Sequence, residues 1–200
     1  AIDGFGDTDT LSNIERVRGT EFDDVLIGSS GKNRIRGLAG NDVIDGGEGF
    51  DTADYSVDAF SGGTLGVNVD LAAGTAIDGF GDTDTLSNIE EVKGTLFDDT
   101  ITGDGADNSL SGSAGNDVID GGEGFDKADY SADVFSGGTL GVNVDLAAGT
   151  AIDGFGDTDT LTNIERVKGT NQADIITGSG ANERFFGLGG NDVIDGGGGG

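Results

Sequence analysis

Residues 112–129 read GSAGNDVIDGGEGFDKAD and divide into two rows of nine, GSAGNDVID and GGEGFDKAD. Each row begins with Gly, has Asp at its sixth position (Asp117, Asp126) and an apolar residue at its eighth (Ile119, Ala128). Gly takes positive φ freely, so the first half of a row can turn tightly. Strand side chains alternate faces, so the eighth residue points one way and its two neighbours the other. Each row therefore predicts one turn and one short strand.

The same row recurs eleven times in phase. The rows fill three blocks, at residues 19–54, at 94–129 and from 169 onward. The blocks belong to units with a period of 75 residues, namely 1–75, 76–150 and a partial unit, 151–200. Repeats of this kind are typical of solenoids. Two rows complete one coil, so stacked coils predict two parallel sheets with the eighth-position residues between them.

Composition restricts the function. The chain has 41 Gly among 200 residues, 38 Asp and Glu against 10 Lys and Arg, a formal charge of −28, and neither Cys nor His. Disulfides, thiolate metal sites and Ser-His-Asp catalysis are thereby excluded. So negative a chain argues against nucleic acid or an anionic membrane as partner. No apolar run approaches the ~18 residues of a membrane span.

The acidic residues follow the phase of the rows. Rows that are 18 residues apart stack on the same edge, which places Asp24 over Asp42 and Asp99 over Asp117. Bare carboxylates at a strand spacing of about 4.8 Å would repel one another. Ca²⁺ takes 6–8 oxygen ligands, at about 2.3–2.6 Å, and Gly-rich turns bring main-chain carbonyls close enough to complete such a shell. Surface solvation alone would need no fixed spacing from a Gly, and no EF-hand loop is present.

The pattern G-G-x-G-x-D-x-U-x resembles the calcium-binding nonapeptide of the RTX, or hemolysin-type, proteins. The resemblance implies an all-β fold, a parallel β-roll or β-solenoid, with calcium held by Asp side chains of alternate turns and by turn carbonyls. Asn33, Asn108 and Glu183 depart from the pattern at position 6 and mark weak sites or spacers. The ligand candidates in the rows are Asp24, Asn33, Asp42, Asp51, Asp99, Asn108, Asp117, Asp126, Asp174 and Asp192.

The segments between the blocks carry further candidates. Residues 79–87, GFGDTDTLS, fit one more row, with Asp84 sixth and Leu86 eighth. The residues equivalent to Asp84 in the other two units are Asp9 and Asp159. Here a calcium site and a simple acidic turn remain equally open. Residues 67–71 alternate as a strand does, and residues 56–66 predict a protruding loop in which Phe60 covers an edge.

The chain starts in mid-unit and ends in a run of Gly within a motif, so we expect one continuous solenoid that belongs to a longer array. The favoured hypothesis is a calcium-binding structural segment of a large secreted or surface protein, such as an adhesin, an S-layer protein or an extracellular filament. Its partners would be calcium and further copies of itself or cell-surface polysaccharide. The alternative is an accessory, polysaccharide-contacting module of a secreted protease, lipase or alginate epimerase.

We expect no enzymatic activity of the segment itself. The resemblance implies type I secretion from Gram-negative bacteria in an unfolded state, followed by folding outside the cell where calcium is plentiful. Binding and folding would then be one event, as in other metal-dependent folds.

Overall fold

The second half of each nine-residue row forms a three-residue strand in the computed structural model, which describes residues 13–199. The first block is preceded by β1 (Arg16–Arg18) and contains β2 (Val25–Ile27), β3 (Arg34–Arg36), β4 (Val43–Asp45) and β5 (Thr52–Asp54). The second is preceded by β9 (Glu91–Lys93) and contains β10 (Thr100–Thr102), β11 (Ser109–Ser111), β12 (Val118–Asp120) and β13 (Lys127–Asp129). The third is preceded by β17 (Arg166–Lys168) and contains β18 (Ile175–Thr177), β19 (Arg184–Phe186) and β20 (Val193–Asp195).

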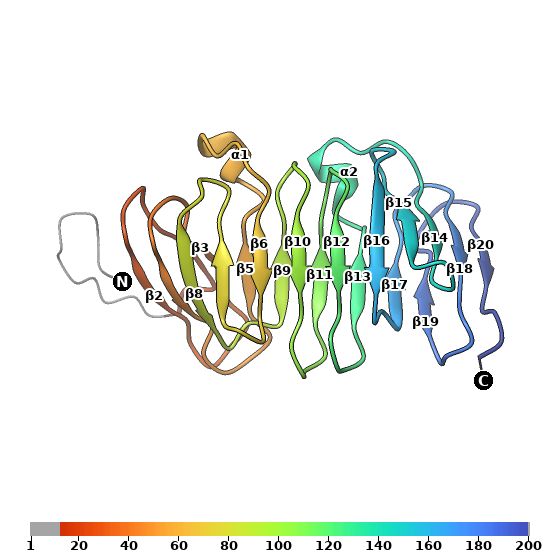
Figure 1. Cartoon of the computed structure of the whole chain (residues 1–200), viewed down its shortest axis with the longest axis horizontal. Helices are drawn as coiled ribbons and strands as arrows, with labels where there is room; N and C mark the ends of the chain where they lie inside the picture. Colours follow the sequence, from red (N-terminus) through yellow and green to blue (C-terminus); the bar gives the residue numbers. More distant parts are fainter. Residues whose placement is uncertain (1–12, 200) are drawn as a thin grey trace.

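Successive strands of a block join opposite sheets. One sheet has eight strands in the order β1-β3-β5-β9-β11-β13-β17-β19. The other has twelve, in the order β2-β4-β8-β7-β6-β10-β12-β16-β15-β14-β18-β20. Rows 18 residues apart pair in parallel, for example Leu26 opposite Ile44 in β2 and β4. The result is an elongated solenoid with β2 and β20 at opposite ends (Figure 1), which confirms the predicted all-β, largely parallel roll.

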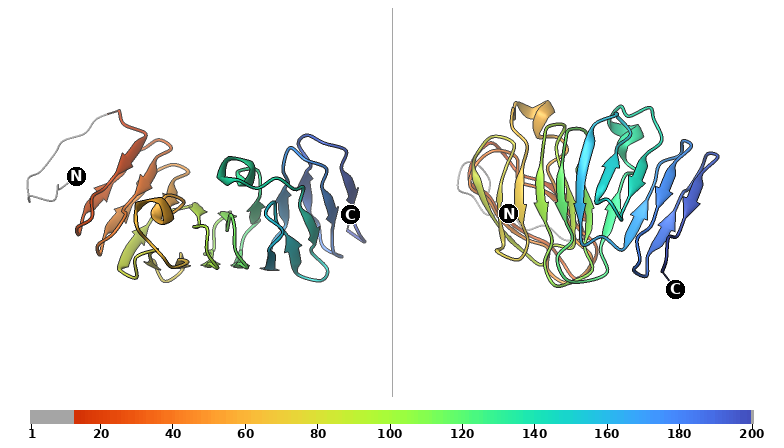
Figure 2. Two further views of the ribbon diagram at one scale, coloured as in Figure 1. Left: turned by 90° about the horizontal axis from the view of Figure 1, so that it is seen from above. Right: turned by 45° about the vertical axis from the view of Figure 1, so that its right-hand side comes forward.

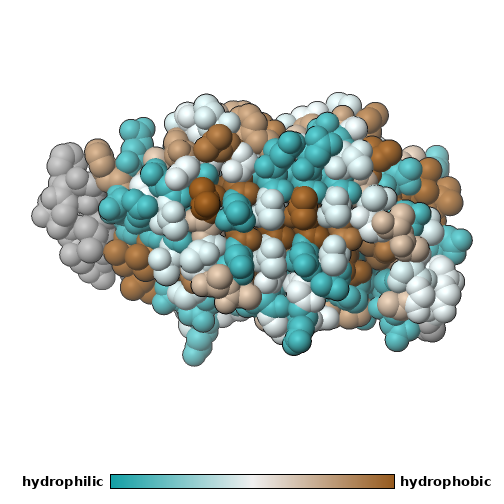
Figure 3. Space-filling model, in the orientation of Figure 1, coloured by the Kyte–Doolittle hydropathy of each residue, from teal (hydrophilic) through white to brown (hydrophobic). Residues whose placement is uncertain are grey.

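The core is a narrow stack between the two sheets. Side chains at the eighth position are buried along almost its whole length, with Ile44, Ile101 and Ile119 each at most 1% exposed. Ile194 in β20 is exposed because no further described coil covers it. Outside the core, apolar side chains are scattered. On the face drawn in Figure 3, the brown hydrophobic patches are small and broken up by teal and white groups.

The linkers between the blocks depart from the parallel pattern. The first contains α1 (Asp58–Ser61), β6 (Asn68–Asp70), β7 (Thr75–Ile77) and β8 (Thr83–Ser87). The second contains α2 (Asp133–Ser136), β14 (Asn143–Asp145), β15 (Thr150–Ile152) and β16 (Thr158–Thr162). Strands β7 and β15 run antiparallel to both of their neighbours, so the roll is parallel except at these two strands.

A tight turn causes this reversal. After β6, Asp70 accepts a hydrogen bond from the N–H of Ala73, and Gly74 has a left-handed φ of 70°. The chain therefore doubles back as β7 before β8 resumes the direction of the rows. Strand β8 pairs with β4 and sets Leu86 opposite Ile44, which confirms that residues 79–87 continue the row phase.

The segment at 56–66 differs from its prediction. It contains the short helix α1, which ends at Gly62 with a φ of 114°. Phe60 is 74% exposed, and its counterpart Phe135 on α2 is 86% exposed. Phe60 therefore covers no edge, because the helix turns its ring outward and away from the sheets.

Each 75-residue period lengthens the two sheets unequally. From β9 to the equivalent β17, the eight-stranded sheet gains three strands, whereas from β10 to β18 the other sheet gains five. Seen from above, the solenoid is bowed (Figure 2). No helix in the described part of the chain is long and apolar enough to cross a membrane.

Candidate metal centre

The sixth-position side chains stack along the two edges of the solenoid, each just before a strand. The strand registers set Asp24 beside Asp42 and Asp99 beside Asp117, as the spacing predicts. The other predicted stacks are also confirmed, namely Asn33 with Asp51, Asn108 with Asp126 and Asp174 with Asp192.

A hydrogen-bond ladder joins each stack. The backbone N–H of Asp99 donates to Oδ1 of Asp117 at 2.8 Å, and the N–H of Asp117 donates to Oδ1 of Asp159 at 3.1 Å. Asp24, Asp42 and Asp84 repeat the arrangement, with distances of 2.8 and 3.0 Å. The neighbouring coil thereby fixes one oxygen of each accepting carboxylate. The second oxygen of that carboxylate determines what the turn can bind.

The Gly that opens each row makes room for the carboxylate at position 6. A Cβ on Gly37 would lie 2.0 Å from Oδ2 of Asp42, and one on Gly112 would lie 1.8 Å from Oδ2 of Asp117. Heavy atoms that are not bonded to each other essentially never lie so close to a Cβ. The fixed spacing between Gly and Asp therefore has a steric cause: the carboxylate folds back over its own turn.

The turns are of two kinds. In the first kind, position 2 is Thr, Asp or a Ser other than Ser113, and its backbone N–H donates to the side chain at position 6, as from Thr95 to Asp99 at 2.7 Å. The same local bond holds Asp24, Asn33, Asn108, Asp174 and Glu183.

In the second kind, position 4 is Gly with a left-handed φ, such as Gly115 at 117° and Gly124 at 138°. Position 2 is left-handed as well, in Gly122 at 88° and even in Ser113 at 79°. Here Oδ2 is buried without any hydrogen-bond partner, in Asp42, Asp51, Asp117 and Asp126. Left-handed residues at positions 2 and 4 thus leave a carboxylate oxygen free, because these turns lack the local bond that the other turns make.

The remaining candidates fall into neither class. Asp84 and Asp159 are buried, and both oxygens already hold partners, since Tyr55 and Tyr130 donate to their Oδ2 atoms at 3.1 and 3.0 Å. A calcium-binding role for these two stays a prediction. Asp192 stands in a turn with left-handed Gly190 and is only partly buried. Asp9 lies outside the described residues.

Sequence reasoning missed Glu90 and Glu165. Oε2 of Glu90 accepts the N–H of Asp51 at 2.8 Å, and Glu165 accepts that of Asp126 at 2.9 Å. They extend the second stack across the junction between blocks. Counting nine residues back from Gly94 would have found Glu90, since it puts Glu90 sixth and the buried Val92 eighth.

Burial and mutual repulsion disfavour the charged form of these carboxyls. Burial raises the pKa of Asp117 to about 9, with further increases from the charges of Asp99 and Asp159. Burial also raises the pKa of Asp42 to about 7 and of Asp126 to about 6, and neighbouring acidic groups add to both. At neutral pH these turns therefore need a bound cation or a bound proton.

The donor set fits calcium. It consists of buried carboxylate oxygens without partners beside Gly-rich turns, and hard oxygen ligands are what Ca²⁺ requires. Among residues 13–199 no three acidic side chains converge closely enough to hold a metal by themselves. Asp42, Asp51, Asp117 and Asp126 would therefore bind together with main-chain carbonyls, and the ion would supply the positive charge that the turns lack.

Substituting Gly112 by Ala should weaken calcium-dependent folding, because the new Cβ collides with Oδ2 of Asp117. Overpacking of this kind costs about 1–3 kcal/mol, which corresponds to roughly a 5- to 150-fold change in an equilibrium constant. The calcium midpoint followed by far-UV circular dichroism measures it. Gly105→Ala is the control, since nothing lies within 4 Å of that Cβ. Equal midpoints for the two variants would contradict the steric argument.

The metal-free chain should gain β structure as pH falls. Carboxyls with a raised pKa bind protons more tightly when folded, so their contribution to stability is complete below the ordinary pKa, near about 4. That contribution is lost as pH rises through about 6 to 9, the range of Asp126, Asp42 and Asp117. Circular dichroism in chelator at pH 8.5 and pH 4.5, at constant ionic strength, checks this. More β structure at the higher pH would refute it.

Comparison with protein families agrees with this geometry. The sequence model of one family, described as the RTX calcium-binding nonapeptide repeat (4 copies), matches residues 18–53, 93–128 and 168–200. These segments cover more than half of the chain and coincide with the three blocks of rows. The chain belongs to the family of RTX calcium-binding nonapeptide repeats, and its repeats bind calcium.

Proposed function

We propose that this calcium-binding repeat segment of a secreted bacterial protein serves as a structural spacer in a large surface-associated protein, such as an adhesin, an S-layer protein or a filament. The repeated junction between blocks carries the proposal. Strand β5 pairs with β9 through Ala53 and Val92, and β13 pairs with β17 in the same register through Ala128 and Val167. A junction that repeats itself allows units to be added without limit, as in other solenoids.

Calcium controls when this rod forms. The chain carries −28 formal charges, and many of its carboxylates are buried by folding. Without a cation their repulsion and desolvation oppose the folded state. The protein would therefore cross the cell envelope unfolded and fold where calcium is plentiful, at the roughly 10⁻⁴–10⁻³ M typical of extracellular modules.

Small-angle X-ray scattering on chains with increasing numbers of 75-residue units tests this function. In calcium, three added strands in one sheet and five in the other, at about 4.8 Å each, should lengthen the particle by about 19 Å per unit. In chelator, or with Mg²⁺ alone, the 200-residue chain should have a radius of gyration near ~48 Å, the value for an unfolded chain. Equal compaction by Mg²⁺, or particles that widen instead of lengthening, would contradict the proposal.

The eight-stranded sheet favours a second candidate, contact with an acidic polysaccharide. All ten Lys and Arg residues of the chain lie on or beside its outward face, and the twelve-stranded sheet has none. They are Arg16, Arg18, Lys32, Arg34, Arg36, Lys93, Lys127, Arg166, Lys168 and Arg184.

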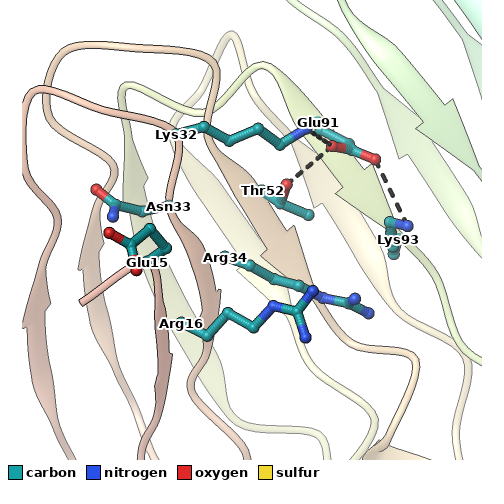
Figure 4. Close-up of a pocket in the computed structure, with 8 residues that line it drawn as sticks. All are labelled: Glu15, Arg16, Lys32, Asn33, Arg34, Thr52, Glu91 and Lys93. Atoms are coloured by element: carbon teal, nitrogen blue, oxygen red, sulfur yellow. Dashed lines mark hydrogen bonds and ion pairs between the residues drawn. The ribbon is translucent and has the colours of Figure 1, made fainter. Parts of the chain in front are cut away.

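Grooves lie along this face. In one of about 430 Å³, Lys32 and Lys93 pair with Glu91 at 3.0 and 3.6 Å, while Arg16 and Arg34 lie side by side (Figure 4). A second groove runs between α1 and α2 and is lined by Arg34, Lys93 and the exposed rings of Phe60 and Phe135. Cations beside aromatic rings suit a linear polymer of acidic sugars.

Calorimetric titration with a uronic-acid oligosaccharide too short to gel with calcium tests this candidate. Phe60→Ala combined with Phe135→Ala should weaken binding, since both rings are exposed and their loss leaves the core intact. Val118→Ala, on the outward side of the other sheet, is the control. Absence of binding, or equal binding by both variants, would rule out this groove as the contact.

A further inference from the structure

Two aspartates of each linker are buried outside the nonapeptide rows. In the first linker Asp58 begins α1, and Asp78 precedes the turn that leads from β7 into β8. They are 1% and 0% exposed, and so are their counterparts Asp133 and Asp153 in the second linker. All four lie outside the segments that the family model matches.

Backbone groups hold these side chains in place. Oδ2 of Asp58 accepts the N–H of Gly79, the residue after Asp78, at 3.2 Å. Oδ1 of Asp78 accepts three N–H groups, from Phe80, Gly81 and Asp82, at 2.8–2.9 Å. The second linker repeats this arrangement, with Gly154 donating to Asp133 at 3.1 Å and three N–H groups donating to Asp153.

Three of the four carboxylates have an oxygen without a partner. Oδ2 of Asp78, Oδ2 of Asp153 and Oδ1 of Asp133 are buried and make no hydrogen bond. Within the described part of the chain no ion pair reaches any of the four residues. Burial raises the pKa of Asp58 and of Asp133, and among the neighbouring charges those of Asp78 and Asp153, respectively, add most to the increase. Two buried like charges without a counter-charge are strongly unfavourable.

Gly79 and Gly154 lie against the hydrogen-bonded oxygens of Asp58 and Asp133. A Cβ on Gly79 would lie 3.1 Å from Oδ2 of Asp58 and 3.3 Å from the carbonyl oxygen of Leu65. On Gly154 it would lie 2.9 Å from Oδ2 of Asp133. Gly at this position therefore keeps clear a place where carboxylate and main-chain oxygens approach each other.

We propose that Asp58 with Asp78, and Asp133 with Asp153, form a second class of calcium site, one in each linker and distinct from the turns of the rows. Only oxygen donors are present, and a hard divalent cation is their natural ligand. With two carboxylates at each site, main-chain oxygens such as that of Leu65 complete the shell. The ion would fasten α1 to the hairpin of β7 and β8, at the point where one block passes into the next.

The double variant Asp78→Asn with Asp153→Asn tests the proposal. Asn keeps the oxygen that accepts the three N–H groups and removes one charge from each site. Equilibrium dialysis with saturating calcium should find two fewer ions bound per chain than in the unchanged protein. Asp70→Asn with Asp145→Asn is the matched control, because these residues also accept turn N–H groups in the two linkers but are only partly buried. The control should lose none.

A crystal of the unchanged protein grown in calcium makes the test independent of how the variant folds. Anomalous difference density is expected between Asp58 and Asp78, and again between Asp133 and Asp153. Full calcium binding by the Asn variant, or a water at both positions, would overturn the linker sites while leaving those of the rows intact. Failure of the unchanged chain to bind calcium at all would instead overturn the function proposed above.

Discussion

The coils at residues 37–54 and 112–129 each bury two carboxylates, those of Asp42 and Asp51 and those of Asp117 and Asp126, whose Oδ2 atoms have no hydrogen-bond partner and whose charge a bound cation would neutralise. The side chain at position 6 must fold back over its own turn, because its backbone N–H and one of its oxygens are committed to the coils on either side. The thin core of one apolar residue per strand offers little to offset that burial. We therefore expect cation binding at the turns and folding of the chain to occur together. The glycines that open the rows leave the space that the carboxylates need.

The two kinds of turn differ in whether they leave a carboxylate oxygen without a partner. Turns in which the N–H of position 2 donates to the side chain at position 6, such as those of Thr95 and Ser29, satisfy their own side chains. Turns with left-handed residues at positions 2 and 4 leave Oδ2 of Asp42, Asp51, Asp117 and Asp126 free. Ser113 takes the left-handed conformation at some cost in strain, which a Gly such as Gly122 avoids. The alternation concentrates the unpartnered carboxylate oxygens of the rows in the last two rows of each of the first two blocks.

Much of this architecture follows from the sequence, because strict periodicity fixes register. The stacking of Asp99 on Asp117 and the burial of Ile119 need only the 18-residue coil. The reversal at β7 was not predictable in this way, since it depends on a local turn at Gly74 that interrupts the period. Asp58 and Asp78 escaped notice for the same reason. They stand at no repeated distance from a row and meet only through the tertiary contact of α1 with the hairpin.

The unequal gain of strands has a mechanical meaning. A body that grows by five strand widths on one side and three on the other cannot be straight, and the eight-stranded sheet, which carries the Lys and Arg residues, is expected on the inside of the bend. Many units in series would then form an open superhelix. Pulled at its ends, such a superhelix would yield first by uncurling, before any pair of strands separates.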